Sequence, residues 1–271
     1  MLKKRTIFKL CVSILLYFFA INLNAQNPFI ENKGQFPNQV KAKVNLPSGS
    51  LFIEDGRLVY SFYSSEQLVA AHDLSRSKAI IDAHAYTMDF INSNTNISTD
   101  LLEESIYYEN YFLGKKASWA ANVKSFKLLY QSNIYNGIDI KFYIVEDKLK
   151  YDFIIAPHVD VNLIKIKYQG IEKIKLIKGN LYTTTSVNTI KESIPYAYQI
   201  INGMVVEVRC NYKLNKETIS FYFPEGYNDN YELIVDPILE FSTYSGSISD
   251  NFGYTATYDN FGFLYAGSTS F

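Results

Sequence analysis

The sequence predicts an all-β protein: an antiparallel β-sandwich-like domain, built as one or two lobes, followed by an incomplete β-propeller-type repeat. Three observations predict this fold class. Apolar and polar residues alternate along roughly a dozen segments, which is the side-chain period of a strand with one buried face. Turn sequences separate the segments about every 8–12 residues, a spacing typical of antiparallel sandwiches and barrels. The chain is also rich in aromatic residues, with 23 Tyr and 19 Phe, which pack well on pleated sheets.

Residues 1–25 are predicted to be a secretory signal peptide. A basic leader precedes an apolar run at 10–23, and Leu23, Asn24 and Ala25 offer a small-residue cleavage site before Gln26. An uncleaved membrane anchor is the alternative. The run argues against it, because it is shorter than the about 20 apolar residues of a membrane span. We therefore expect a secreted or cell-surface protein that meets the membrane only through this segment during export.

The charge of the mature chain excludes one class of partner. Removal of the signal peptide takes away four basic residues and leaves 22 Lys and Arg against 27 Asp and Glu, a net charge of −5. An acidic chain lacks the basic surface that nucleic-acid binding requires, so no nucleic-acid partner is expected.

Cys210 is the single cysteine that remains after cleavage, so no intrachain disulfide can form and the core must hold the fold. The apolar residues Met204, Val206 and Val208 precede it at alternate positions. This phase favours a small buried hydrophobe over a reactive thiol.

Strands make up almost all of the elements predicted before residue 134. In chain order these elements are a strand at 40–46, a hairpin of 50–55 and 57–63, a short helix within 66–77, a strand at 80–91, a loop at 92–96, a helical turn or strand at 101–108 and a strand at 122–130. Asp55 and Gly56 form the hairpin turn, because glycine supplies the positive φ that such a turn needs. A break near residues 93–100 separates the lobes if there are two.

A central hairpin is predicted over residues 134–157, where two alternating runs flank a polar break. The apolar positions of the two runs are Ile138, Ile140, Phe142, Ile144, Leu149, Tyr151, Phe153 and Ile155. With Asp147 and Lys148 as a two-residue loop, this prediction pairs Ile144 with Tyr151, Phe142 with Phe153 and Ile140 with Ile155. A shift of one residue would expose all of them, because side chains alternate between faces.

The alternation continues from the central hairpin to residue 235. The predicted strands are 161–168, 171–177, 181–186, 189–194, 196–201, 204–214, 218–223 and 231–235. Residues 178–180 join the second of these strands to the third. Asn202 and Gly203 give the strongest short hairpin signal in the chain. The all-β domain is accordingly assigned to residues 26–240.

The segment 241–271 is assigned to the partial propeller repeat. Its sequence Asp-Asn-Phe-Gly at 250–253 recurs at 259–262, and both copies are predicted to be turns between short strands. Calcium binding at Asp250 and Asn251, or at Asp259 and Asn260, is the alternative in an exported protein. Because a full oxygen cage needs about six or more ligands, no metal ligand is assigned.

The histidines do not form a recognisable site. His72, His84 and His158 lie outside any spacing that would bring two ligands to one metal, and each is expected to be structural or solvated. The chain also lacks a GxSxG nucleophile elbow and a phosphate-binding GxxxxGK[ST] loop.

Asp139 and Asp152 form the one candidate pair of catalytic carboxylates. Both lie on the polar face of the central hairpin, and glycosidases use two carboxylates that flank the scissile bond. The interleaved Lys141 and Lys150 favour cross-strand ion pairing instead. Aromatic residues, Trp119 among them, are expected to pack in the core, with a sugar-binding face as the alternative. No catalytic residue, cofactor-binding residue or cofactor is assigned.

Six motifs occur in an order that points to a known family. They are ENKGQF at 31–36, NYFLG at 110–114 followed by Trp119 and Asn122-Val123, YNGIDIKFY at 135–143, KYDFIIAP at 150–157, IPYAYQ at 194–199 and LIVDP at 233–237. Together they resemble an uncharacterised β domain of exported bacterial proteins. In that family the domain commonly precedes SBBP-type β-propeller repeats and, often, a type IX secretion or gliding-motility-associated sorting domain. The segment 242–267 looks like one such repeat.

The resemblance implies a modular secreted or cell-surface protein, and it brings no assigned activity and no catalytic positions. His158 departs from the pattern, which usually has Gly after the proline. The single repeat also differs from the roughly 4–8 blades of a propeller, so a fragment or truncated copy is expected.

The predicted function is therefore an exported, non-catalytic structural or adhesive module, the N-terminal part of a larger propeller-containing protein, with a glycan or a surface protein as partner. Two alternatives stay open. One is a carbohydrate- or peptide-cleaving domain, and the other is a module that helps a downstream propeller to fold or presents it.

Overall fold

The computed structural model describes residues 28–71, 80–112, 114–145, 148–237, 239–242, 251–258 and 264–270. Every strand pair within these ranges is antiparallel, and the one α-helix that they contain is α2 (Ser65–Ala71). This confirms the all-β, antiparallel part of the predicted fold class. The predicted signal peptide at 1–25 lies outside the described residues. Within them, no helix has the length and apolar character that a membrane crossing requires.

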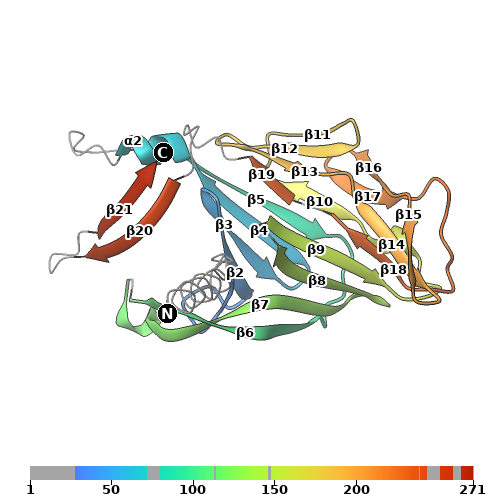
Figure 1. Cartoon of the computed structure of the whole chain (residues 1–271), viewed down its shortest axis with the longest axis horizontal. Helices are drawn as coiled ribbons and strands as arrows, with labels where there is room; N and C mark the ends of the chain where they lie inside the picture. Colours follow the sequence, from blue (N-terminus) through green and yellow to red (C-terminus); the bar gives the residue numbers. More distant parts are fainter. Residues whose placement is uncertain are drawn as a thin grey trace, which may run out of the picture.

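A 15-stranded sheet forms most of the protein (Figure 1). Its strands in spatial order are β15 (Met204–Val208), β14 (Tyr196–Ile201), β18 (Leu233–Asp236), β9 (Lys148–Ile155), β8 (Ile138–Val145), β7 (Ala120–Tyr135), β1 (Phe29–Glu31), β2 (Val40–Leu46), β3 (Gly49–Glu54), β4 (Arg57–Tyr63), β5 (Ala83–Phe90), β10 (Ile166–Gln169), β17 (Thr218–Tyr222) and β16 (Asn211–Asn215), with β6 (Ser98–Tyr111) paired to β7 outside this path.

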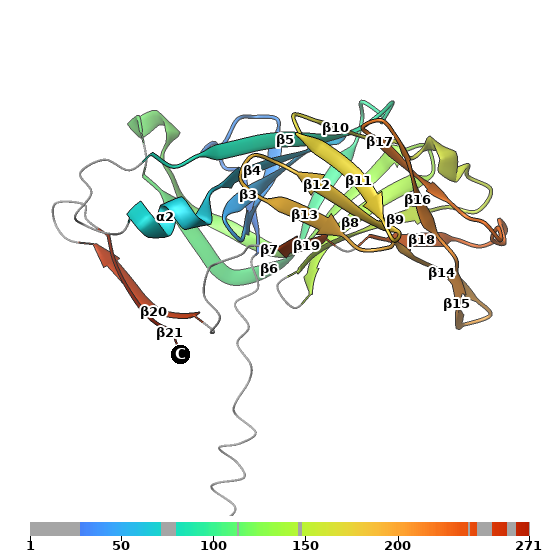
Figure 2. The same cartoon turned by 90° about the horizontal axis from the view of Figure 1, so that it is seen from above.

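A second sheet of four strands packs against the first. It consists of β11 (Lys173–Ile177), β12 (Asn180–Thr184), β13 (Thr189–Glu192) and β19 (Leu239–Ser242). Figures 1 and 2 show the main sheet strongly bent, with the small sheet lying against it. Leu181 and Ile190 of the small sheet belong to the same buried cluster as Tyr60, Phe142 and Phe153 of the main sheet. The two sheets therefore share one hydrophobic core, as in a sandwich.

Alternation of side chains decides which face of each strand enters the core. Along β2 the residues Val40, Ala42, Val44 and Leu46 are buried while the intervening residues are partly exposed. The same period along β8 and β9 buries the apolar positions of the predicted central hairpin except Ile144, which is partly buried. Phe142 and Phe153 are both fully buried, as the alternation requires.

Several predicted hairpins have the expected turns. Glu54 pairs with Arg57 across Asp55 and Gly56, and Ile201 pairs with Met204 across Asn202 and Gly203. Asn202 and Gly203 both have positive φ, 52° and 78°, which is the geometry of a type I′ turn. The predicted strand at 40–46 also has its expected bounds.

The predicted register of the central hairpin is wrong by two residues. Val145 pairs with Lys148, so Phe142 faces Tyr151 and Ile140 faces Phe153. The residues between the two strands are Glu146 and Asp147, one position earlier than predicted. A shift of two residues leaves every side chain on its predicted face, because the period of a strand is also two.

Two predicted strands are not continuous. Residues 161–168 divide into a 3-10 turn, η2 (Val161–Leu163), and β10, and the Asp160 side chain accepts a hydrogen bond from the Asn162 backbone at the start of the turn. Residues 204–214 divide into β15 and β16, which pair with different strands. At the second corner periodicity does not show the division, because the buried positions Val208, Cys210 and Tyr212 stay in phase across it.

Other predictions have mixed outcomes. Residues 101–108 form part of strand β6 and no helical turn. The predicted helix is confirmed over Ser65–Ala71, and residues 72–79 lie outside the described residues. The strands on either side of residues 93–100 belong to one sheet, and the division into lobes stays a prediction.

The C-terminal segment contains two further strands, β20 (Asn251–Tyr258) and β21 (Leu264–Ser270), which pair with each other. The first of the two predicted turns is wrong for residues 251–253, because they begin β20. The second, at 259–262, lies outside the described residues. β19 spans residues 239–242 and so crosses the predicted domain boundary at residue 240.

Candidate functional site

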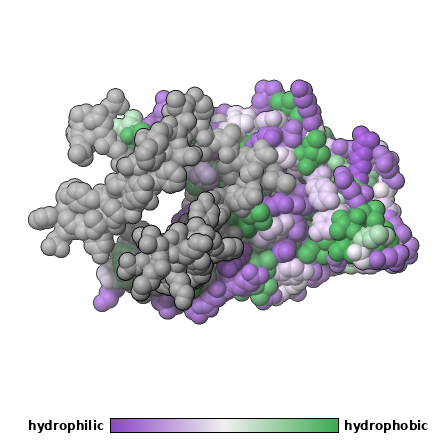
Figure 3. Space-filling view, viewed as in Figure 1, coloured by the Kyte–Doolittle hydropathy of each residue, from purple (hydrophilic) through white to green (hydrophobic). Residues whose placement is uncertain are grey.

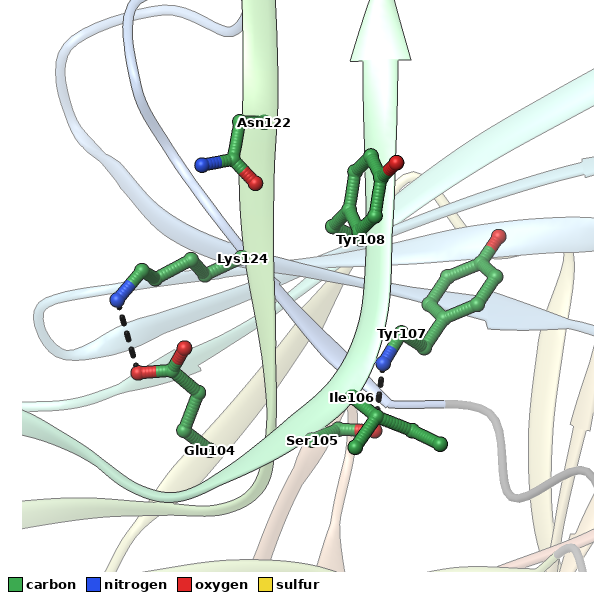
Figure 4. A pocket seen from close by; sticks show the side chains of 7 residues that line it. All are labelled: Glu104, Ser105, Ile106, Tyr107, Tyr108, Asn122 and Lys124. Carbon is green, nitrogen blue, oxygen red and sulfur yellow. Dashed lines mark hydrogen bonds and ion pairs between the residues drawn. The ribbon is translucent and has the colours of Figure 1, made fainter.

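A hollow of about 330 Å³ opens where β6 and β7 part from each other (Figure 4). Glu104 pairs with Phe126 and Tyr108 pairs with Lys124, so three residues of β6 face the single Ser125 of β7. This bulge turns the side chain of Ile106 fully into solvent. The hollow is lined by Glu104, Ser105, Ile106, Tyr107, Tyr108, Asn122 and Lys124.

Tyr107 and Tyr108 line this hollow, and two further exposed rings, Phe112 and Trp119, lie at the end of the same pair of strands. Tyr107, Tyr108 and Phe112 are each at least half exposed, and Trp119 is 45% exposed. Trp119 follows the 3-10 turn η1 (Lys116–Ser118) and packs edge-on against Phe112, with ring centroids 5.5 Å apart. The prediction that Trp119 packs in the core is therefore wrong. We call the four rings and the hollow the aromatic arm.

Polar groups of the aromatic arm are arranged in pairs. Lys124 forms an ion pair of 2.9 Å with Glu104, at the edge of the hollow in Figure 4. Glu109 accepts hydrogen bonds from the hydroxyls of Tyr107, at 3.0 Å, and Tyr111. Burial and the neighbouring Glu109 raise the pKa of Tyr107, so its hydroxyl stays protonated and acts as a donor. The arm thus combines ring faces with an ion pair and with tyrosine hydroxyls that are held by a carboxylate.

Asp139 and Asp152, the predicted carboxylate pair, both lie on the outer face of the central hairpin but have separate partners. Asp139 accepts hydrogen bonds of 2.6 Å from the Tyr130 hydroxyl and from the Asn133 backbone. In the register Asp139 faces Ile154, which makes it a diagonal neighbour of Asp152.

Asp152 belongs to a second cluster, which includes a residue that the sequence did not point to. Its carboxylate accepts a hydrogen bond of 3.0 Å from Tyr143, and the neighbouring carboxylate is Asp236 of β18. Lys150 lies 2.5 Å from Asp236. Burial, together with the charge of Asp236, raises the pKa of Asp152 to about 6. Burial also raises the pKa of Asp236.

The role of Asp236 follows from long-range pairing. β18 pairs with β9 across more than 70 residues of sequence, in a register that aligns Val235 with Phe153. Asp236 then follows on the face opposite to Val235, beside Lys150 and Asp152. The motif LIVDP contains the residue, but no local pattern indicates which strand it will meet.

The remaining predicted residues lie apart from both sites. His84 contacts the Ser186 hydroxyl at 2.9 Å and the Gly170 carbonyl at 2.6 Å, while His158 is exposed, 3.7 Å from Asp229. His72 lies outside the described residues. Cys210 is buried, as predicted, and burial raises the pKa of its thiol to about 12. Met204 and Val206 are exposed, because β15 is an edge strand.

The part of the chain that the structure describes contains no group of three His, Cys, Asp or Glu side chains arranged to hold a metal ion. Asp250, Asp259 and Asn260 of the calcium alternative lie outside that part, and Asn251 begins β20. That alternative stays a prediction.

Apolar side chains also gather at the end of the molecule that carries β14 and β15, at the right of Figure 3. The exposed residues there are Ile200, Met204 and Val205. Beside them is a hollow of about 250 Å³ that is lined in part by Tyr196, Glu207 and Arg209. It has fewer exposed rings than the aromatic arm.

Comparisons with known proteins place the chain in a family. Searches against curated proteins and against solved structures found no match. A family model described as "Domain of unknown function (DUF7948)" matches residues 29–238. This range contains every strand of the main sheet and three of the four strands of the small sheet, all except β19. The chain therefore belongs to the DUF7948 domain family.

Proposed function

We propose that this protein is an exported, non-catalytic adhesive module that binds glycans through the aromatic arm of β6 and β7. The observation that carries the proposal is the set of four exposed rings along β6 and β7, two of which, Tyr107 and Tyr108, line the hollow. Sugar rings present C–H faces that stack on aromatic side chains and hydroxyls that need donors and acceptors. Tyr108 and Trp119 supply ring faces, and Asn122 with the Lys124–Glu104 pair supplies polar partners.

Exposure of these rings supports binding over a purely structural role. A large aromatic side chain contributes most to folding when it is buried, yet Tyr108 and Phe112 are both 56% exposed. Several such rings close together on one surface are typical of interaction sites. The carboxylate of Asp139 supports the non-catalytic reading, because it is engaged by the Tyr130 hydroxyl and the Asn133 backbone.

A glycan array with the mature protein tests the proposal. We expect binding to a subset of glycans, and a loss of about tenfold or more in affinity for both Trp119→Ala and Tyr108→Ala, since a stacked ring contributes about 1.5 kcal/mol. Tyr222→Ala is the matched control, because Tyr222 is equally exposed but lies on β17. Absence of binding to any glycan, or equal loss in all three variants, would overturn the proposal.

The exported location and the propeller context are part of the same proposal. The basic leader and apolar run of residues 1–25 support export, and the resemblance of 242–267 to an SBBP-type repeat supports a place ahead of a β-propeller. N-terminal sequencing of the protein recovered outside the inner membrane is expected to begin at Gln26. Recovery with Met1 in the cytoplasmic fraction would contradict export.

A further inference from the structure

Lys150 and Asp236 form an unusually enclosed ion pair between neighbouring strands. The Lys150 Nζ lies 2.5 Å from the Asp236 Oδ2, and the two side chains are 18% and 10% exposed. Two other lysine–carboxylate pairs, Lys41–Asp55 and Lys124–Glu104, are 2.9 Å long and between 33% and 51% exposed. The Lys150–Asp236 pair is therefore both closer and less exposed to solvent than these surface pairs.

The surroundings of this pair are those of a reactive group and not only of a salt bridge. The second carboxylate oxygen of Asp236, Oδ1, is buried and has no hydrogen-bond partner among the described residues. An ionised carboxylate with a bare, buried oxygen is costly, whereas an amide carbonyl bears less charge and tolerates such a position better. Lys150 also lies over the ring of Tyr143, 5.6 Å from its centroid. Asp152 is the neighbouring acid.

We propose that Lys150 and Asp236 join in an intramolecular isopeptide bond between β9 and β18. The proton of the ammonium group passes to the carboxylate, which leaves a neutral amine beside a neutral carboxylic acid. The Lys150 Nζ then attacks Cγ of Asp236, so that an N–C bond forms and a C–O bond breaks. The hydroxyl leaves with a second proton from the nitrogen as one water molecule. No oxidant, reductant or further reactant is needed.

Two physical conditions favour this step. Burial raises the pKa of Asp236, which makes the neutral carboxylic acid that reacts more accessible there than in water. The fold also holds the nucleophile beside the carboxylate, with Nζ 2.5 Å from Oδ2, and well-oriented intramolecular reactions reach effective molarities of about 10⁵–10⁸ M.

Asp152 is the residue that assists the transfer of protons. It lies beside Asp236, is itself mostly buried, and receives a hydrogen bond from the Tyr143 hydroxyl that fixes its orientation. With its raised pKa it can accept the second proton from the nitrogen and pass it to the leaving hydroxyl, so that it ends the step unchanged. We assign Asp152 as a positioning and proton-transfer residue for bond formation.

The bond would give this fold a covalent link that its cysteine content cannot supply. Only Cys210 follows the predicted signal peptide. The link would join residues 150 and 236 and close a long loop of chain that contains the whole small sheet except β19. This inference does not depend on glycan binding.

Intact mass spectrometry of the purified full chain tests the proposal directly. We expect a mass lower than that of the sequence by one water molecule, and a tryptic digest in which the peptide that contains Lys150 is joined to the peptide that contains Asp236. Lys124 and Glu104 should be recovered in unlinked peptides, because their pair is exposed. A full-length mass without the deficit, with Lys150 and Asp236 in separate peptides, would overturn the proposal.

Two variants test the bond itself and the role of Asp152 separately. Lys150→Arg keeps the positive charge but has no amine that can form the bond. It should therefore show the full mass, and its circular dichroism spectrum should match that of the folded parent. A deficit that persists in this variant would contradict the assignment. Asp152→Asn keeps both bonding residues, and we expect at least a tenfold slower loss of water when chains that have never folded, and so carry no link, are allowed to fold. An unchanged rate would overturn the role of Asp152.

Discussion

The carboxylate of Glu192 on β13 lies 3.0 Å from the hydroxyl of Tyr151 on β9, in the core between the two sheets. Its other oxygen accepts a hydrogen bond from Tyr168 of β10. Glu192 is almost wholly buried, and its only described side-chain partners are these two hydroxyls. One residue of the small sheet thus binds two strands of the main sheet, and burial raises the pKa of its carboxyl group.

Glu192→Ala should destabilise the fold strongly. The change leaves two buried tyrosine hydroxyls without an acceptor, and each unsatisfied group costs about 1–3 kcal/mol. Glu192→Gln keeps a carbonyl acceptor of similar size and should cost less. Urea unfolding measures both, with the exposed Glu172→Ala as the control that stays within about 0.5 kcal/mol of the parent. Equal stabilities for Glu192→Ala and Glu172→Ala would refute this link between the sheets.

Asp152 should make stability depend on pH. Burial is the larger cause that raises its pKa from 3.8 to about 6, so the folded state binds the proton more tightly than the unfolded state. The contribution is fully present below about pH 4 and is lost as the pH rises through about 6. Each pKa unit corresponds to about 1.4 kcal/mol, so this contribution is about 2 to 3 kcal/mol at most.

Asp152→Asn removes this titration, because asparagine stays neutral. The free energy of unfolding of the parent, relative to that of the variant, should therefore fall between pH 4 and pH 7. Denaturant unfolding at a series of pH values measures the difference. Parallel curves for the two proteins would contradict the expected dependence.

His158→Gly should stabilise the protein. His158 has a φ of 62°, a left-handed conformation that glycine adopts without strain, and its backbone N–H donates to the Asp229 carbonyl in either case. We expect the free energy of unfolding to rise by about 0.5–1 kcal/mol. This is the relief of the left-handed strain minus the cost of the greater conformational entropy that glycine gives to the unfolded chain. His158→Ala keeps the strain and serves as the control. A glycine variant no more stable than the alanine variant would rule this account out.

Gly49→Ala should be destabilising for a steric reason. A Cβ at this position would lie 2.3 Å from the Ser61 carbonyl oxygen and 2.6 Å from the Phe62 Cδ1. Relief of that overlap requires a shift of β4, at a cost of about 1–3 kcal/mol. Thermal unfolding should show the loss, whereas Ser50→Ala on the other face should change little. A neutral effect of Gly49→Ala would mean that the two strands are further apart than described.

Local sequence signals predicted the strands well and their partners poorly. The turn at Asn202 and Gly203 was predictable because two residues with positive φ specify a type I′ hairpin by themselves. The register of the central hairpin was not predictable. Ile144 pairs with Leu149, and Tyr151, the predicted partner, would also have placed an apolar side chain opposite it. Both registers bury the same face, so alternation cannot distinguish them.

The chemically notable residues were the least predictable. Asp236 and Glu192 gain their roles only through contacts with residues 86 and 41 positions away, and no local pattern encodes such pairing. Trp119 was expected in the core, because a large ring is most often buried. It lies exposed directly after the 3-10 turn η1, which the sequence did not reveal.

Calorimetric titration of the mature protein with its best array glycan tests the central claim, that the aromatic arm binds sugar. The account predicts saturable binding by the parent and by Tyr222→Ala, and at least about tenfold weaker binding by Trp119→Ala, since 1.4 kcal/mol corresponds to a factor of ten. Identical affinities for the parent and Trp119→Ala, with both proteins folded, would contradict it.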